Sequence, residues 1–164
     1  MKFKDLPIMS DKEGVVLFKP HIPKNAKKAI NKTLNTRWIG QGPQVDKFEK
    51  IFSSKFARNC STVSTGSGTD ALHLSYILAG LKKGDEVITP VFTCTATNIP
   101  FLYMGIKIKF ADVEKDTFNI DPLSVEKLIT KKTKAVVCVH YGGVPCNMRK
   151  LNEICKKNKI TLIA

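Results

Sequence analysis

The sequence predicts an α/β fold with a mostly parallel sheet and alternating helices. Three observations carry this prediction. Apolar patterns typical of strands and of helices alternate four times between residues 60 and 163. Residues 135–139 are apolar throughout, as in a strand that is covered on both faces. The chain has 164 residues, of which 43% are hydrophobic, enough for a core without disulfides or metal.

The amino-terminal part is expected to hold an extended arm and two helices. Residues 1–22 contain proline and glycine with few periodic apolar residues, which predicts the arm. Pro23 suits the first turn of a helix, and apolar residues then recur at helical spacing as far as Leu34. The glycines and proline of residues 38–43 predict a loop, and Pro43 can begin a second helix. One apolar stripe follows along that helix: Val45, Phe48, Phe52 and Phe56.

The remaining elements follow from apolar runs and their boundaries. Strands are expected over residues 60–65, 86–89, 106–110, 135–139 and 160–163, and helices over 69–79, 95–104, 122–129 and 148–157. Gly80 and Gly105 close two helices, and Asp121 caps a third. In a parallel sheet, ligands lie beyond the carboxyl ends of the strands. We therefore expect functional residues in the segments that follow the strands: 65–69, 90–97, 112–116 and 140–145.

Charge and cysteine content narrow the function classes. The net charge is +13, which raises a nucleic-acid partner as one alternative. The lysines are scattered, however, and only three arginines are present, which favours a solvated basic surface. The five cysteines form no C-x-x-C pair and no metal set, so we expect free thiols in a reducing compartment. No apolar leader or membrane span is found, and the protein is expected in the cytoplasm.

The strongest candidate site is the glycine-rich turn Ser67-Gly68-Thr69-Asp70 between a strand and a helix. Free N–H groups at a helix start, together with its positive dipole end, suit a phosphate. The alternative is a plain turn in which Ser67 or Thr69 caps the helix. The spacing also fits a dinucleotide motif, but no acid stands at the carboxyl end of the next strand to bind a ribose.

Two further segments hold candidate functional residues. Cys94 lies among small and hydroxyl residues after the second strand, where a flat ligand has room, but a free cysteine is commonly an inert buried thiol. His140 follows the most apolar strand and can act as an acid, a base or an orienting group. A single histidine at a strand end also commonly has a purely structural role.

The ordered series of motifs resembles one family. It runs from Trp38-Ile39-Gly40-Gln41-Gly42-Pro43 through Ser67-Gly68-Thr69-Asp70-Ala71-Leu72 to Gly84-Asp85-Glu86-Val87-Ile88-Thr89-Pro90 and Thr117-Phe118-Asn119-Ile120-Asp121. This series resembles the amino-terminal part of the DegT/DnrJ/EryC1/StrS family of sugar aminotransferases, which depend on pyridoxal phosphate. The resemblance implies a truncated large domain of fold type I over residues 23–164. It also implies amino transfer, from glutamate, to a nucleotide-linked keto-sugar in glycan biosynthesis, by a homodimer without a membrane segment.

Residue roles come with the resemblance. The cofactor phosphate is expected at the turn formed by Ser67, Gly68, Thr69 and Asp70. Cys94 takes the place of an aromatic residue that stacks on the pyridine ring in many relatives. Trp38, Gly40 and Gln41 match a loop near the substrate entrance.

The resemblance also places two catalytic groups beyond Ala164. These are the aspartate that pairs with the pyridine nitrogen and the lysine that binds the cofactor covalently. We therefore expect no catalytic residue within the 164 and no activity unless the chain is completed. Two alternatives are a non-catalytic remnant or interaction module of the same fold and, more weakly, a basic nucleic-acid-binding protein.

Overall fold

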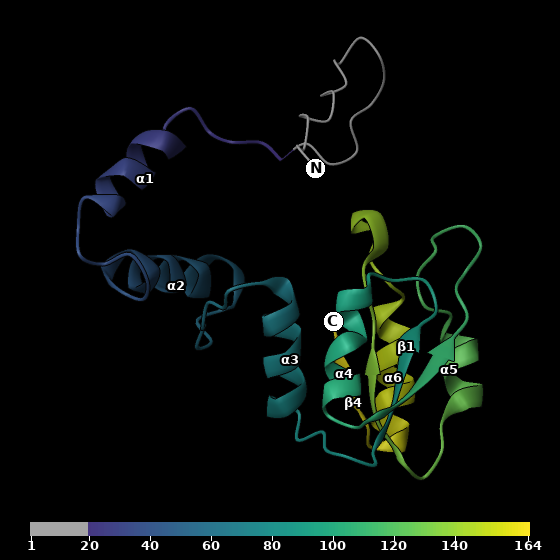
Figure 1. Ribbon diagram of the computed structural model, residues 1–164. Coiled ribbons are helices and arrows are strands. Elements are labelled where there is room, and N and C mark those ends of the chain that lie inside the picture. The colour runs from purple at the N-terminus through teal and green to yellow at the C-terminus, as the bar shows by residue number, and fades with distance from the viewer. Residues whose placement is uncertain (1–19) are drawn as a thin grey trace, which may run out of the picture. The chain divides into compact units, whose positions relative to one another are not determined.

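The computed structural model describes residues 20–164 and divides into two compact units, Met1–Thr62 and Val63–Ala164 (Figure 1). Each unit is described by itself. The expected arm over residues 1–22 falls almost wholly outside the described residues and stays a prediction.

The first unit contains the two expected helices, α1 (Ala26–Leu34) and α2 (Pro43–Phe56). Proline stands at the start of α2, as its missing N–H allows. The rings of Phe48, Phe52 and Phe56 follow one another along α2, with centroids 5.9 and 5.2 Å apart. Neither helix contains a buried residue, so the predicted stripe exists but lies exposed.

The second unit is built on four parallel strands in the order β2-β1-β3-β4. Their bounds are β1 (Glu86–Pro90), β2 (Lys107–Ala111), β3 (Thr133–Val137) and β4 (Thr161–Ile163). The two central strands are almost entirely buried, which explains their continuous apolar runs. The predicted parallel sheet is therefore confirmed.

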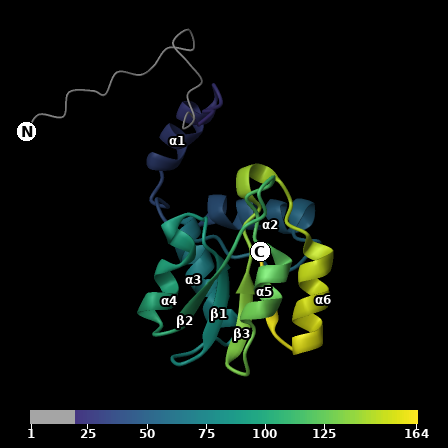
Figure 2. The same cartoon turned by 90° about the vertical axis from the view of Figure 1, so that its right-hand side faces the viewer.

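Helices cover both faces of this sheet. They are α3 (Gly68–Leu78), α4 (Ile99–Tyr103), α5 (Pro122–Leu128) and α6 (Met148–Asn158), with the short turns η1 (Thr95–Thr97) and η2 (Tyr141–Gly143). Figure 2 shows α3 and α4 on one side and α5 and α6 on the other. Successive residues of β1 serve both cores, since Val87 packs with α3 and α4 while Ile88 packs with α5 and α6. Among residues 20–164, no helix is long and apolar enough to span a membrane.

The predicted helix boundaries follow the expected chemistry. Gly80 and Gly105 lie just after α3 and α4 with φ of 73° and 65°, a left-handed conformation that glycine adopts readily. Asp121 caps α5, since its Oδ1 accepts a hydrogen bond from the Leu123 N–H at 2.9 Å.

Two element predictions are wrong. Residues 60–65 form no strand, because a strand needs a hydrogen-bonding neighbour and none of β1 to β4 pairs with them. The expected helix over residues 95–104 is divided into η1 and α4 at Asn98. Pro100 lies in the first turn of α4, where its lack of an N–H is tolerated, so the helix begins anew there.

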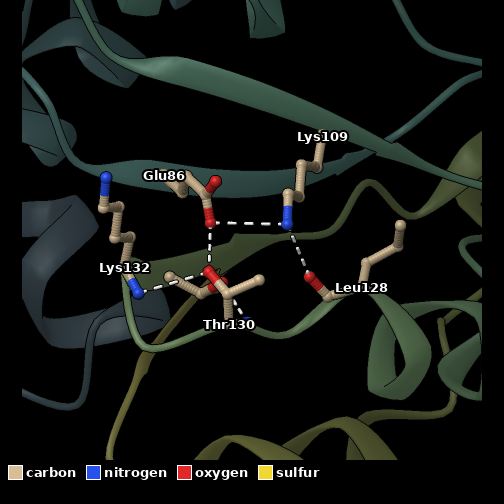
Figure 3. A network of polar contacts seen from close by, with 6 residues as sticks. Glu86, Lys109, Leu128, Thr130 and Lys132 are labelled. Atoms are coloured by element: carbon tan, nitrogen blue, oxygen red, sulfur yellow. Dashed lines mark hydrogen bonds and ion pairs between the residues drawn. The ribbon is translucent and has the colours of Figure 1, made fainter.

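A polar network holds the amino ends of the strands (Figure 3). Glu86 of β1 pairs with Lys109 of β2 at 3.4 Å and accepts a hydrogen bond from the Thr130 hydroxyl. The Lys109 ammonium also donates to the Leu128 carbonyl at 3.1 Å. Three segments, β1, β2 and the α5–β3 connection, are thereby joined at the edge opposite the carboxyl ends.

Candidate functional site

The turn that begins α3 is organised by its own capping residue. The Ser67 Oγ accepts a hydrogen bond from the Asp70 N–H at 3.1 Å and donates one to Asp70 Oδ2 at 2.8 Å. Ser67 is therefore the N-cap, as one of the two alternatives predicted, and Asp70 stabilises the positive end of the helix. The side chains of these two residues are engaged with each other.

Gly68 and Thr69 keep donor groups that the cap does not use. The first N–H groups of an α-helix have no acceptor within the helix, and only that of Asp70 is met by the Ser67 side chain. A Cβ built on Gly68 would meet no heavy atom within 4 Å, so the backbone there can be approached closely. Thr69 adds a hydroxyl donor on the same turn. This part of the turn has the donor set that a phosphate requires.

Tyr76 fixes α3 against the next element. Its hydroxyl donates to the Thr97 carbonyl at 2.9 Å, and its ring stacks on Phe101 at 4.0 Å. Burial raises the pKa of Tyr76 to about 12, so the phenol stays neutral and keeps its proton for this bond. The phosphate-type turn is thus held on a helix whose middle is anchored in the core.

Cys94 lies in the segment after β1 and precedes η1. Its side chain is exposed, which contradicts the alternative of an inert buried thiol. The Thr93 and Thr97 hydroxyls lie 2.8 Å apart and close the segment on itself. The cysteine side chain is therefore exposed on a turn with local hydrogen bonding, and its contact with a cofactor stays a prediction.

Two buried oxygens near the carboxyl end of β1 lack a hydrogen-bond partner among the described residues: Thr89 Oγ1 and Asn98 Oδ1. Unpaired buried polar groups are costly, so each of them calls for a partner such as an ordered water or a ligand. Thr89 is the penultimate residue of β1, and Asn98 separates η1 from α4. Both belong to the segment that also carries Cys94.

His140 has a structural role. Its Nδ1 accepts a hydrogen bond from the Cys146 N–H at 3.2 Å, which places its proton on Nε2. The ring therefore holds the turn after β3 in place. The structural alternative for this histidine is the better one.

Trp38, Gly40 and Gln41 lie in the first unit, in the loop between α1 and α2, and all three are exposed. The Arg37 guanidinium lies 5.4 Å from the Trp38 ring centroid. A Cβ at Gly42 would lie 3.1 Å from the indole, so glycine allows the ring to pack on the backbone. Their suggested contact with substrate stays a prediction.

Sequence reasoning missed a group of aromatic residues, Phe92, Phe118 and Tyr141, and the amide that supports them, Asn119. Each ring follows a different strand, and the three centroids lie within 6.2 Å of one another. Their position after successive strands was the available signal, but only the sheet order shows that the strands are neighbours.

Known proteins are similar to this chain in sequence and in fold. GDP-perosamine synthase of Escherichia coli O157:H7 is 34% identical over 151 residues, which are 91% of this chain and 41% of the synthase. The structure of Escherichia coli GDP-4-keto-6-deoxy-D-mannose-3-dehydratase with bound hydrated pyridoxal phosphate superposes with a TM-score of 0.80 at 31% identity. It is matched over 89% of this chain and 39% of the dehydratase. Bacillus subtilis NtdA with bound pyridoxamine phosphate gives 0.79 at 32% identity, over 83% of this chain and 31% of NtdA.

The chain thus spans about two fifths of the length of the relatives that it matches first. The structures of the dehydratase and of NtdA carry pyridoxal or pyridoxamine phosphate, and the family binds this cofactor. Residues 20–164 match a single family description, that of a group of aminotransferases. The chain belongs to the DegT/DnrJ/EryC1/StrS aminotransferase family.

Proposed function

We propose that this chain provides the phosphate-binding part of an aminotransferase that depends on pyridoxal phosphate and acts on a nucleotide-linked keto-sugar. The observation that carries the proposal is the start of α3, where Gly68 and Thr69 offer donors next to open space. Because the chain spans about two fifths of the length of these relatives, the activity and the substrate are part of the proposal.

The residues present fit the cofactor. The N–H groups of Gly68 and Thr69, with the Thr69 hydroxyl, would bind the phosphate at the positive end of an 11-residue helix. Cys94 would lie against the pyridine ring, where a thiol gives less contact than an aromatic ring. When bound, pyridoxal phosphate supplies the electron sink on which amino transfer depends. Ser67 and Asp70 position this turn through their mutual hydrogen bonds.

The substrate and setting are part of the proposal. A guanosine-diphosphate keto-sugar is supported by the names of a relative and a structural neighbour, both of which refer to GDP-linked sugars. Glutamate as amino donor and a homodimer follow from the family resemblance. A cytoplasmic location is supported by the five free thiols, which suit a reducing compartment.

The phosphate-binding role is tested by Thr69→Val, which removes one hydroxyl without changing side-chain volume. Pyridoxal phosphate should bind about tenfold more weakly to this variant, because a hydrogen bond to a charged group is lost. Thr161→Val, at an exposed threonine of β4, is the matched control and should bind as the wild type does. Equilibrium dialysis measures the affinity of both variants for pyridoxal phosphate. Pyridoxal, which lacks the phosphate, is the comparison ligand. Equal affinities for the two variants would contradict the assignment.

The reaction is tested on the protein as the cell makes it. The protein is incubated with pyridoxal phosphate, GDP-4-keto-6-deoxymannose and glutamate whose amino group carries a heavy nitrogen isotope. Mass spectrometry should then find the heavy nitrogen in an amino sugar. The dehydratase among the structural neighbours makes loss of water the second candidate reaction. A dehydrated sugar without the label would show that the protein catalyses loss of water and not amino transfer.

A further inference from the structure

Three aromatic rings form a surface that the cofactor site does not use. Phe92 follows β1, Phe118 follows β2 and Tyr141 follows β3, and we call them the aromatic platform. Their centroids are separated by 4.7 Å between Phe92 and Tyr141, 5.8 Å between Phe92 and Phe118, and 6.2 Å between Phe118 and Tyr141. Although the rings contact one another, they remain 44%, 50% and 41% exposed. Rings that contact one another and still present this much surface can pack against a further flat ring.

The platform lies where ligands of parallel sheets bind. β2, β1 and β3 are neighbours in the sheet, and all three residues come after the carboxyl ends of these strands. Both views draw the loop after β2 and the yellow-green turn of η2 at the same end of the sheet (Figures 1 and 2). Phe92 is also only two residues from Cys94, the residue proposed to lie against the cofactor ring.

Asn119 holds two of the three loops together. Its side chain is 1% exposed. Its Nδ2 donates to the Val144 carbonyl at 3.0 Å, and its Oδ1 accepts from the Tyr141 N–H at 2.9 Å. A buried amide with both ends bonded fixes the loop after β2 against the turn after β3. The platform is therefore built before any ligand arrives.

Phe118 adopts a backbone conformation that is costly for its side chain. Its φ is 57°, in the left-handed region that bulky residues rarely occupy. The conformation is imposed locally, since the Phe118 N–H donates to the Glu114 carbonyl at 3.0 Å and the Glu114 N–H to that of Asn119 at 2.9 Å. Burial does not offset this cost, because Phe118 is 50% exposed. Strain of this kind at an exposed side chain points to function.

We infer that the aromatic platform binds the base of the nucleotide-linked sugar, and this inference rests on the proposed function. Nucleobases present flat π-faces that stack on aromatic side chains in offset or tilted geometry. The three rings are tilted by 48° to 62° from one another, so they offer both faces and edges to one flat ring. No other part of a nucleotide sugar is aromatic, and its pyrophosphate and sugar would seek charged or polar partners instead.

The test measures GDP binding by calorimetry in the protein as the cell makes it. Tyr141→Leu removes a ring but keeps the backbone N–H that Asn119 accepts, and Phe118→Asn removes a ring with a residue that tolerates positive φ. Each should weaken GDP binding about 5-fold to 100-fold. Binding of pyrophosphate, which has no base, should not change. Tyr103→Leu, at a 77% exposed tyrosine of α4, is the matched control and should bind GDP normally.

A measurement on the wild type needs no variant. In a saturation-transfer NMR experiment, saturation of the protein's aromatic protons should pass to the guanine H8 of bound GDP. Absence of this transfer, absence of GDP binding, or equal affinities in all variants would each overturn the inference. So would a Tyr141→Leu variant that loses affinity for pyridoxal phosphate rather than for GDP. If GDP binding needs the platform while Thr69→Val leaves cofactor affinity unchanged, the platform stands and the cofactor assignment fails. If the platform variants bind GDP normally while Thr69→Val weakens cofactor binding, the platform fails and the cofactor assignment stands.

Discussion

Burial separates the five cysteines into two chemical groups. Cys60 and Cys94 are exposed, whereas Cys138, Cys146 and Cys155 are buried in the core on the α5 and α6 side of the sheet. Burial raises the pKa of Cys138 to about 12 and that of Cys155 to about 11, and it also raises the pKa of Cys146. The thiolate is the reactive form, so a thiol with a pKa near 12 holds about a thousandfold less of it than an ordinary one.

A disulfide reagent should therefore modify two thiols of the native chain rapidly and the other three only after unfolding. Cys60→Ser and Cys94→Ser should each remove one of the fast reactions. Pyridoxal phosphate should slow the modification of Cys94 and leave that of Cys60 unchanged, if the former lies against the bound cofactor. Rapid reaction of three or more thiols in the folded chain would contradict the assigned burial.

Residue roles were predictable where they depend on near neighbours. The cap at Ser67 involves residues three apart, and the sequence could name it as one of two alternatives. Asn119 could not be found in this way, because its partners Tyr141 and Val144 are 22 and 25 residues away. Exposure of Cys94 likewise depends on how the segment after β1 folds back, which no local pattern encodes.

The network around Glu86 acts between elements, since it joins β1, β2 and the connection from α5 to β3. The hydrogen bond from Thr130, together with Lys109 and Lys132, lowers the pKa of Glu86 against a smaller opposing effect of desolvation. A carboxylate with a lowered pKa stabilises the folded state above its unfolded pKa of about 4.3. This stabilisation is lost as the pH falls through the lower pKa of the folded state.

Glu86→Gln should thus lower the free energy of unfolding at neutral pH and reduce its further loss on acidification. Urea unfolding at pH 7 and at pH 3 measures both effects. Glu126→Gln is the control, because Glu126 forms only an exposed ion pair with Lys157 at 3.4 Å, and such pairs contribute little. If Glu86→Gln and the wild type lost the same stability between the two pH values, the network would have no such role.

Elements were predictable where one segment contains its own signals. The helix from Pro122 has its proline, its cap and its apolar face within eight residues, and the structure places it as expected. Residues 60–65 have a strand-like composition but find no neighbour in the sheet, and a strand is defined by its partner. The division at Asn98 depends on where Pro100 can enter a helix.

The two units differ in how much side chain they bury. All the described residues that are fully buried belong to the second unit, on the two faces of its sheet. In the first unit, α1 and α2 bury none of their residues. Helices of this length are marginal in water without tertiary packing, so their stability within this chain comes mainly from local bonds. The order of the sheet and the exposure of α2 both lie beyond what apolar spacing can predict, since spacing identifies a face but not its partner.

Hydrogen exchange across the whole chain should show this difference. Amides of β1, β3 and α6 should exchange slowly, because they open only when the core of the second unit unfolds. Amides of α1 and α2 should exchange close to the rate of an unstructured peptide, because no buried side chain opposes the opening of either helix. Phe52→Ala should leave protection of β3 unchanged, whereas Val136→Ala should reduce it, since Val136 is fully buried in the core. Strong protection of α2 in the isolated chain would mean that its phenylalanine stripe is covered, and would contradict the exposure on which the expectation depends.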